Sequence, residues 1–454
     1  MQFSKILKAL VVSGAVLATS QSFAAASRYS WVVNDLYTQN HPFAAQASNE
    51  LATKMQKMNS SAFMFFRGSN DIFFKDMTTL TPSSYMNTAT NQVWLQGDMH
   101  IANLGALRDD SGHDIFDISD FDEGYFGSYT WDLRRMAVSI VLAAQENGIS
   151  ASNQAQLVHD FSDAYFTKMD DFKGTSQEIG YILTTSNTSG EVKNVIQKEQ
   201  GNSRSTFLAK YTTVSGNRQF QNLSDLVTVP SATYNAIVAA FPSYISSIPA
   251  SKQYSSSYYT IKDIHQKLGS GTGSLGKMRY YVLVEGPSSS TSDDVIIEMK
   301  QQTASSVSLA APGRMPASAY NYNNGYRMVR TAKAMMSDTD RLYGYTSMNS
   351  QDYSLREKSP FQEDFDYTKL TSYSSFKTAV QYAAQVIAKA HASSDQDYDA
   401  TLNSYSEDKQ ITDVVTSRSS FGNELTSFAT DYALQVQYDW ASLGTALTNG
   451  ATLY

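Results

Sequence analysis

The sequence predicts a mixed α+β fold with a helix-rich C-terminal part. Short apolar or aromatic runs that end at turn residues predict strands in the first two thirds of the chain. Apolar residues that recur every three or four positions predict long helices, most of them later in the chain. The chain has 454 residues, which is too many for one small hydrophobic core, so we expect two lobes.

The N-terminus has the composition of a secretory signal peptide over residues 1–24. Lys5 and Lys8 form a positive region, and an apolar stretch too short to span a bilayer comfortably follows. A small-residue cleavage site ends at Ala24 or Ala26. We therefore expect a cleaved leader and a periplasmic or secreted protein; an uncleaved anchor is the alternative.

Composition excludes several classes of partner. The formal net charge of -8 argues against a nucleic-acid-binding protein, because phosphate contacts require clustered Lys and Arg. The chain has no cysteine, so disulfide bonds and lipid attachment through cysteine are excluded. No segment after the leader is long and apolar enough to be a transmembrane helix.

The first lobe is placed at residues 27–260 and is expected to carry three strands and a helical insert. The strands are the runs 62–66, 92–95 and 114–118. The helical period begins at Asp132 and stops at Gly148, and a second helix opens at Ser152. The polar region 184–230 predicts only short elements and loops.

The second lobe is placed at residues 261–345, where a glycine-rich turn precedes a β-hairpin. Its predicted strands are 279–285 and 295–300, joined by a Pro-Ser-Thr turn. Residues 346–454 are expected to form a helical part that packs on the first lobe. The helices predicted in the last third of the chain are 324–336, 376–390 and 423–443.

Asp98 and Asn103 lie five residues apart, as a catalytic base and a metal-binding amide do in phosphotransferase loops. A carboxylate can orient and deprotonate an attacking hydroxyl, while an amide oxygen binds Mg²⁺ without adding charge. Asp120 would supply a charged metal ligand, and Asp122 in the same acidic cluster is a further candidate. A turn capped by Asp or Asn side chains is the simpler explanation of this spacing.

Gly271, Gly273 and Gly276 fit a G-x-G-x-x-G pattern that runs into a strand. A dinucleotide-binding fingerprint would instead run from a strand into a helix. A glycine loop inside a hairpin covers the ATP phosphates in protein kinases. Lys300 ends the following strand, where a kinase lysine would reach the α and β phosphates. A plain Gly/Ser-rich loop and a solvated lysine are the alternatives.

His100 and Arg67 are further candidate residues. His100 is next but one to Asp98, so it could take part in catalysis or brace the loop. Arg67 follows an apolar run and could hold a phosphate through two hydrogen bonds. An ion pair with Asp76 or Asp122 would explain Arg67 equally well.

Taken together, these residues resemble the bacterial family catalogued as domain of unknown function 2252, which is grouped distantly with protein-kinase-like and aminoglycoside phosphotransferase-like folds. The resemblance covers nearly all of the mature chain. It depends on Phe66-Arg67-Gly68 with Asp76, Gly97-Asp98-x-His100 with Asn103-Leu104-Gly105, Asp120-Phe121-Asp122-Glu123, Trp131-Asp132-Leu133-x-Arg135, the loop at Gly271, Lys300, and Ala388-Lys389-Ala390-His391-Ala392.

The resemblance implies a supporting role for Asp132, because a similar Asp-Leu lies at this distance from the metal-binding Asp in related small-molecule kinases. An acid at a helix start is also favoured by the helix dipole alone. The resemblance further implies a two-lobe, protein-kinase-like fold that is circularly permuted, since the glycine loop and Lys300 follow the first acids here. Permutation is physically acceptable where the original termini lie close together at the surface.

The chain departs from the family pattern at two places. Gln301-Gln302 stands where family members tend to have Glu-Ala, and Arg330 stands where they carry an acid. The usual lysine–glutamate ion pair therefore lacks its acid, and Glu298 and Asp338 are possible substitutes.

We expect an exported kinase-like phosphotransferase that uses Mg²⁺ and ATP and acts on an unknown hydroxyl acceptor. A non-catalytic, pseudokinase-type binding module is one alternative, favoured by the missing acid and by the scarcity of ATP outside the cytoplasm. A metal-dependent phosphoester hydrolase is the other, because Asp98-x-His100 resembles the opening of a two-metal site.

Overall fold

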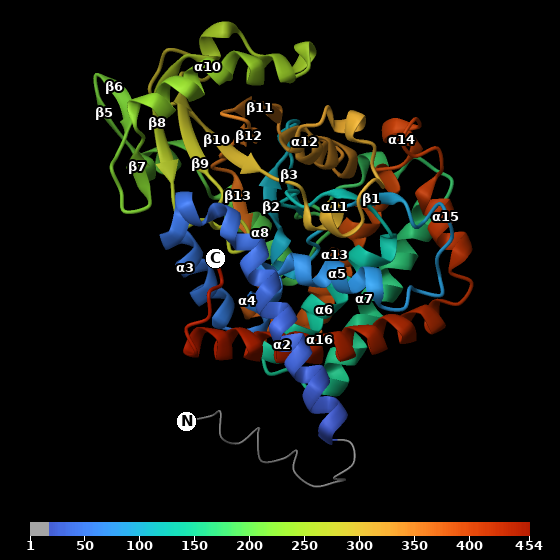
Figure 1. The fold of residues 1–454 in the computed structure, drawn as a ribbon. Coiled ribbons are helices and arrows are strands. Elements are labelled where there is room, and N and C mark those ends of the chain that lie inside the picture. Colours follow the sequence, from blue (N-terminus) through green and yellow to red (C-terminus); the bar gives the residue numbers. More distant parts are fainter. Residues whose placement is uncertain (1–17) are drawn as a thin grey trace.

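The computed structural model describes residues 18–454, with side chains described from residue 27 onward. The chain combines helices with antiparallel sheets, which is the mixed α+β fold that the sequence predicts (Figure 1). The leader predicted at residues 1–24 lies outside the residues whose side chains are described, so it stays a prediction. Within the described part of the chain, no helix has the length and apolar character needed to cross a membrane.

The largest sheet has six strands, and every neighbouring pair in it is antiparallel. In spatial order they are β11 (Gly344–Met348), β12 (Gln351–Glu357), β10 (Val295–Gln302), β9 (Arg279–Val284), β8 (Ile261–Lys267) and β7 (Leu226–Thr228). The predicted hairpin is confirmed, since Val295 pairs with Val284 and Lys300 with Arg279. The sheet extends beyond the predicted range 261–345 at both ends, because β7 precedes it and β12 follows it.

The two faces of this sheet differ because side chains alternate along each strand. One face packs its apolar side chains on α10 (Ser231–Ser247), which lies above the sheet in Figure 1. The other face is apolar at one end, where it contacts the small hairpin of β5 (Thr212–Ser215) and β6 (Asn217–Phe220). On that same face Glu298 and Lys300 are charged, and Lys300 lies against Asp120 and Asp122.

Long helices form the rest of the core. They are α6 (Tyr129–Glu146), α7 (Ala151–Phe172), α12 (Asn324–Met335), α13 (Tyr373–Ser393) and α16 (Arg418–Thr448). These helices confirm the predicted ones, and α16 runs beneath the others in Figure 1. The N-cap of α7 is Ser150 rather than Ser152, because the Ser150 hydroxyl accepts a hydrogen bond from the Asn153 amide. The helical part of 346–454 begins only after β12 and β13 (Gln362–Asp364).

Two small sheets carry the strands predicted near the acids. In the first, β1 (Val93–Leu95) pairs with β4 (Tyr125–Gly127). In the second, β2 (Leu104–Arg108) lies between β3 (Asp114–Ile118) and β13. The strands predicted at 92–95 and 114–118 are thereby confirmed.

The strand predicted at 62–66 is wrong, because these residues begin the helix α4 (Ala62–Gly68). Periodicity cannot distinguish a short apolar run in a strand from one in a buried helix. Here the Ser61 hydroxyl accepts a hydrogen bond from the Met64 amide at 3.1 Å, which caps the helix. The helix then buries Phe63, Phe65 and Phe66.

The remaining elements are shorter or were not predicted. The helices among them are α2 (Ala18–Asn40), α3 (Ala44–Asn59), α5 (Asn70–Thr79), α8 (Gly190–Gln200), α9 (Arg204–Tyr211), α11 (Ser306–Ala310), α14 (Gln396–Asp399) and α15 (Glu407–Val414). The 3₁₀ turns are η1 (His41–Phe43), η2 (Ile101–Asn103), η3 (Glu178–Gly180), η4 (Ala250–Lys252), η5 (Ser256–Tyr259), η6 (Ala317–Tyr320) and η7 (Tyr367–Lys369). The short elements expected in 184–230 are present as α8, α9 and the strands β5 to β7.

Candidate functional site

The aspartate turn, residues 96–103, joins β1 to β2 and carries the first candidate acid. Gly97 has a φ of +79°, and a Cβ at this position would lie 2.1 Å from the carbonyl oxygen of Glu123. A side chain there would therefore be strained and would also clash. The glycine lets the turn approach the acidic segment, residues 120–123.

Asp132 fixes the backbone of the aspartate turn. Its carboxylate accepts hydrogen bonds from the Gln96 amide at 2.7 Å and from the Gly97 amide at 3.1 Å. The helix α6 begins at Tyr129, so Asp132 lies inside its first turn and reaches back to the aspartate turn. The supporting role implied for Asp132 thus corresponds to a buried contact that orients the residues just before Asp98.

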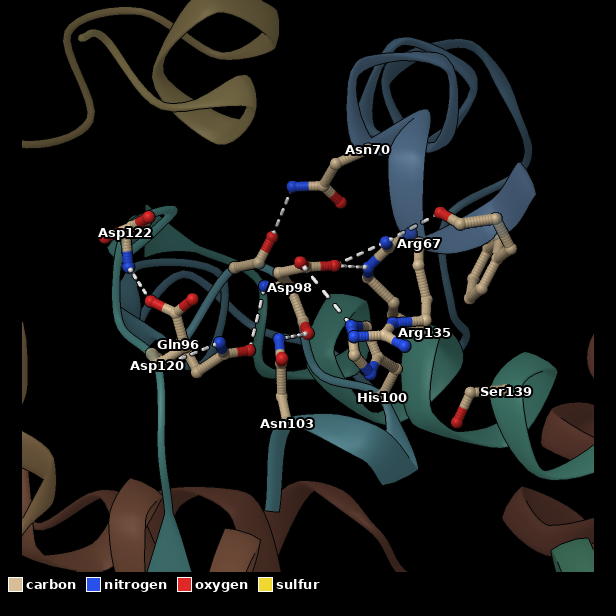
Figure 2. Close-up of polar contacts among 12 residues, drawn as sticks. Arg67, Asn70, Gln96, Asp98, His100, Asn103, Asp120, Asp122, Arg135 and Ser139 are labelled. Atoms are coloured by element: carbon tan, nitrogen blue, oxygen red, sulfur yellow. Dashed lines mark hydrogen bonds and ion pairs between the residues drawn. The ribbon is translucent and has the colours of Figure 1, made fainter. Parts of the chain in front are cut away.

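Asp98 is held by a guanidinium on one oxygen and is open on the other. Arg135 donates to Oδ1 through Nε at 2.8 Å and also through Nη2, while Oδ2 lies 3.7 Å from His100 Nε2 (Figure 2). Burial raises the pKa of the Asp98 carboxyl to about 7, against the opposing charge of Arg135. A carboxyl poised near neutrality with one free oxygen has the properties of a general base.

His100 is buried beside Asp98 without a hydrogen bond to it. The separation of 3.7 Å is too long for a hydrogen bond, and the ring lies edge-on to Phe63. Burial, together with the guanidinium groups of Arg67 and Arg135, holds the pKa of His100 well below its usual range. His100 is therefore a neutral ring that packs under the turn, and its contacts are those of a bracing residue.

The candidate metal ligands lie on one side of Asp98. The Asn103 side chain donates its amide N–H to the Asp98 carbonyl at 2.8 Å, which leaves its amide oxygen for a ligand. The Asp120 side chain is 40% exposed, whereas that of Asp122 is 9% exposed. An amide oxygen and one accessible carboxylate suit Mg²⁺, which takes few protein ligands and keeps several waters.

Lys300 connects the acidic segment to the six-stranded sheet. Its ammonium forms an ion pair with Asp122 and lies 3.6 Å from Asp120 Oδ2. Burial and the charge of Asp122 raise the pKa of Asp120. Although burial opposes its ionisation, Lys300 and Lys277 hold the pKa of Asp122 below its usual range. Asp122 is thus the ionised partner of Lys300, and Asp120 is the more exposed carboxylate of the pair.

Neither acid suggested as a partner for Lys300 fills that role. Glu298 pairs with Arg279 at 2.9 Å, and Asp338 lies 3.4 Å from Lys252. Both suggestions are wrong, because Asp122 is the acid that pairs with Lys300.

The glycine loop, residues 271–276, closes over the acids. Gly271 and Gly273 line the same cavity as Asp98, Asn103 and Asp120, which we call the cleft cavity. Gly276 lies at the edge of the loop with a φ of +103°, packed against Leu51. The fold therefore brings together segments that lie more than a hundred residues apart in the chain.

Arg67 lies on α4 and also lines the cleft cavity. Both ion pairs suggested for it are wrong: Asp76 is held by Arg28, and Asp122 is held by Lys300. Among residues 27–454, no carboxylate lies within 4.0 Å of the Arg67 guanidinium, and its buried Nε has no hydrogen-bond partner. An unpaired guanidinium facing a glycine loop is suited to an anionic ligand such as phosphate.

Several residues of the site were missed in the sequence. Arg135 lies in the segment 131–135 that resembles the family, and Lys277 directly follows Gly276. Their places in the sequence could therefore have suggested both as site residues. Lys277 lines the cleft cavity and lies 4.0 Å from Glu123. The contacts of α3 with the glycine loop carried no signal in the sequence, because Gln46 and Lys57 resemble a solvated helix face.

The hydrolase interpretation requires a cluster of several metal ligands. Among the described residues, no three or more His, Asp or Glu side chains have an arrangement that could hold a metal ion. The pair of Asn103 and Asp120 supplies fewer protein ligands than a two-metal site uses.

The comparisons with known proteins concern the whole chain. The sequence model of a family described as "Uncharacterized protein conserved in bacteria (DUF2252)" matches residues 46–446. No curated protein and no solved structure gave a match. The matched region contains the aspartate turn, the acidic segment, the glycine loop and Lys300. The chain therefore belongs to this family of uncharacterised bacterial proteins, DUF2252.

Proposed function

We propose that the protein is an exported, kinase-like phosphotransferase that uses a magnesium nucleotide to phosphorylate a hydroxyl group. The observation that carries the proposal is the shared cavity of Asp98, Asn103 and Asp120 with the glycine loop. A base, two oxygen ligands for a cation and a phosphate-binding loop are the parts that phosphoryl transfer requires.

Each residue has a role that follows from its contacts. Asp98 Oδ2 accepts the proton of the attacking hydroxyl, and Arg135 keeps the carboxylate oriented through Oδ1. Asn103 and Asp120 would hold Mg²⁺, which neutralises phosphate charge and aligns the transferred group. Residues of the glycine loop and the cations Arg67 and Lys277 line the same cavity. Cations and the backbone amides of such a loop suit phosphates.

The arrangement of the sheet supports a kinase-like interpretation. The glycine loop joins the antiparallel strands β8 and β9, Lys300 lies on the adjacent strand β10, and the helix α12 follows it. Protein kinases place a glycine loop, a lysine-bearing strand and a helix in this order. The acids that would complete the site precede the sheet in this chain, which is the order that a circular permutation would produce.

A pseudokinase-type binding module is the second candidate. Two observations favour it: Arg135 occupies one oxygen of Asp98, and Lys300 is engaged with Asp122. A nucleotide would have to compete with Asp122 for Lys300. Binding without turnover is the outcome that would support this candidate over the first.

The variant Asp120→Asn tests the proposed metal ligand. Mg-ATP at 100 times its Kd should stabilise the wild-type protein by about 2.7 kcal/mol, measured as a rise in Tm. Asp120→Asn should lose most of the part of this shift that depends on Mg²⁺, because an amide replaces the accessible carboxylate. Asp171→Asn is the matched control, since Asp171 is exposed on α7 and pairs with Lys168. An absent shift in the wild type, or an equal shift in Asp120→Asn, would count against the proposal.

A further inference from the structure

A second cavity of about 90 Å³ lies beside the cleft cavity. We call it the N-terminal cavity, because α2, α3, α4 and α5 supply much of its wall. The two cavities share Arg67, Asp98, Glu123, Gly273 and Lys277. The candidate metal ligands line only the cleft cavity.

Asp98 stands between the two cavities. In Figure 2, Asn70 lies on the side of Asp98 opposite to Asn103. A phosphoryl acceptor has to reach the base from the side that the metal and the phosphates do not occupy. The N-terminal cavity is open to Asp98 from that side.

Lys54 gives this cavity a buried positive charge that no carboxylate contacts directly. The residue is 7% exposed, and its ammonium donates to the Asn40 side-chain oxygen at 2.9 Å. No carboxylate among residues 27–454 lies within 4.0 Å of it. Burial and the charge of Lys277 lower the pKa of Lys54 to about 8. The carboxylates of Asp71 and Glu123, which also line the cavity, oppose this shift from beyond 4.0 Å. A buried ammonium without a counter-ion in direct contact is costly, so a bound anion would stabilise it.

Asn70 and Asp71 supply hydrogen-bond acceptors to the same cavity. Asn70 is 9% exposed and donates to the Gly97 carbonyl at 2.8 Å, while its buried Oδ1 has no partner. Burial and the charges of Asp35 and Glu123 raise the pKa of Asp71 to about 7. The oxygens of these two side chains can accept hydrogen bonds from the hydroxyl groups of a ligand.

We infer that the N-terminal cavity binds the phosphoryl acceptor, and that the acceptor is a small hydroxy acid whose carboxylate pairs with Lys54 and whose hydroxyls face Asn70 and Asp98. The inference deepens the proposed function and depends on it for the transfer step. In that step the hydroxyl oxygen forms a bond to the terminal phosphorus, and the bond from that phosphorus to the diphosphate breaks. The hydroxyl proton passes to Asp98, and the nucleoside diphosphate leaves.

The first experiment measures binding without any nucleotide. Glycerate and glycerol are matched probes, because they differ chiefly in the carboxylate. By titration calorimetry, the wild-type protein should bind glycerate at least about tenfold more tightly than glycerol, which corresponds to about 1.4 kcal/mol. Lys54→Met should remove this preference. Lys409→Met should keep it, since Lys409 is 56% exposed and pairs with Asp413. If Lys54→Met does not fold, Lys54→Gln replaces it, because an amide can still donate to Asn40.

The second experiment measures nucleoside diphosphate release from Mg-ATP with each probe. In Lys54→Met the KM for glycerate should rise at least about tenfold with little change in kcat, because Lys54 binds the acceptor away from the reacting atoms. Equal binding of the two probes, or unchanged glycerate binding in Lys54→Met, would overturn the inference. Glycerate binding without turnover would contradict the proposed function alone. Turnover with glycerol equal to that with glycerate would contradict the acceptor class alone.

Discussion

Asp98→Asn is expected to lower the rate of phosphoryl transfer by about 10²–10⁴-fold, the usual contribution of a general base, while Mg-ATP binding is retained. The amide can still accept a hydrogen bond from Arg135, but it cannot take the hydroxyl proton. Because burial raises the pKa of Asp98 to about 7, the ionised fraction of the base increases with pH through neutrality. The wild-type rate should therefore rise with pH up to about 7 and level off above it, as measured in single-turnover transfer assays.

The control for this prediction separates catalysis from stability. Asp98→Asn also weakens a buried ion pair with Arg135, so the rate must be measured at a temperature well below the Tm of the variant. The control variant Asp171→Asn should keep the wild-type rate and its pH profile. A full rate in Asp98→Asn, or a wild-type rate that does not change between pH 5 and pH 8, would show that Asp98 is not the base.

Arg28→Met is expected to lower the free energy of unfolding by about 3–5 kcal/mol, because it leaves buried carboxylates without their cation. Arg28 donates to both oxygens of Asp76 at 2.8 and 2.7 Å. It also donates to both oxygens of Asp439 at 2.9 and 2.6 Å. The Asp439 side chain is 1% exposed. Urea unfolding followed by circular dichroism measures the difference.

Two further variants define the origin of this loss. Adding Asp439→Asn to Arg28→Met should restore part of the stability, since it removes a buried charge that has lost its partner. Lys409→Met breaks an exposed pair that solvent screens, so it should leave the free energy of unfolding nearly unchanged. If Arg28→Met costs as little as Lys409→Met, the cluster is not a structural anchor. Arg28 follows the predicted cleavage sites at Ala24 and Ala26, so the mature protein would retain this contact between α2, α5 and α16.

Much of the fold follows from local sequence patterns. The helix α13 and the hairpin of β9 and β10 can be predicted from the sequence, because their apolar residues keep the helical period of 3.6 and the strand period of 2 over many residues. The prediction of a strand at 62–66 fails because a short apolar segment has no period that distinguishes a strand from a helix. The segment forms a helix, which Ser61 caps and which buries three phenylalanines.

The candidate residues of the site could be predicted from the sequence, but the contacts between them could not. Asp98, Asn103 and Asp120 stand in recognisable local patterns, and their shared cavity with the glycine loop depends on how segments distant in the chain pack together. The ion pair of Lys300 with Asp122 joins residues that lie far apart in the sequence, so strand periodicity could not predict it. Nothing in the sequence distinguishes Lys54 from other lysines on polar helices, because its burial depends on the packing of distant segments such as α2 and α5 around the cavity.

A crystal structure of the mature protein with Mg²⁺ and a non-hydrolysable ATP analogue is the most direct test of the central claim. We expect the metal to bind Asn103 Oδ1 and Asp120 at about 2.0–2.1 Å, with the phosphates beneath the glycine loop and against Lys300. The free oxygen of Asp98, Oδ2, should face the N-terminal cavity, from which the acceptor hydroxyl would approach the terminal phosphate. A nucleotide bound elsewhere, or a metal held by other residues while the cleft cavity stays empty, would contradict the account.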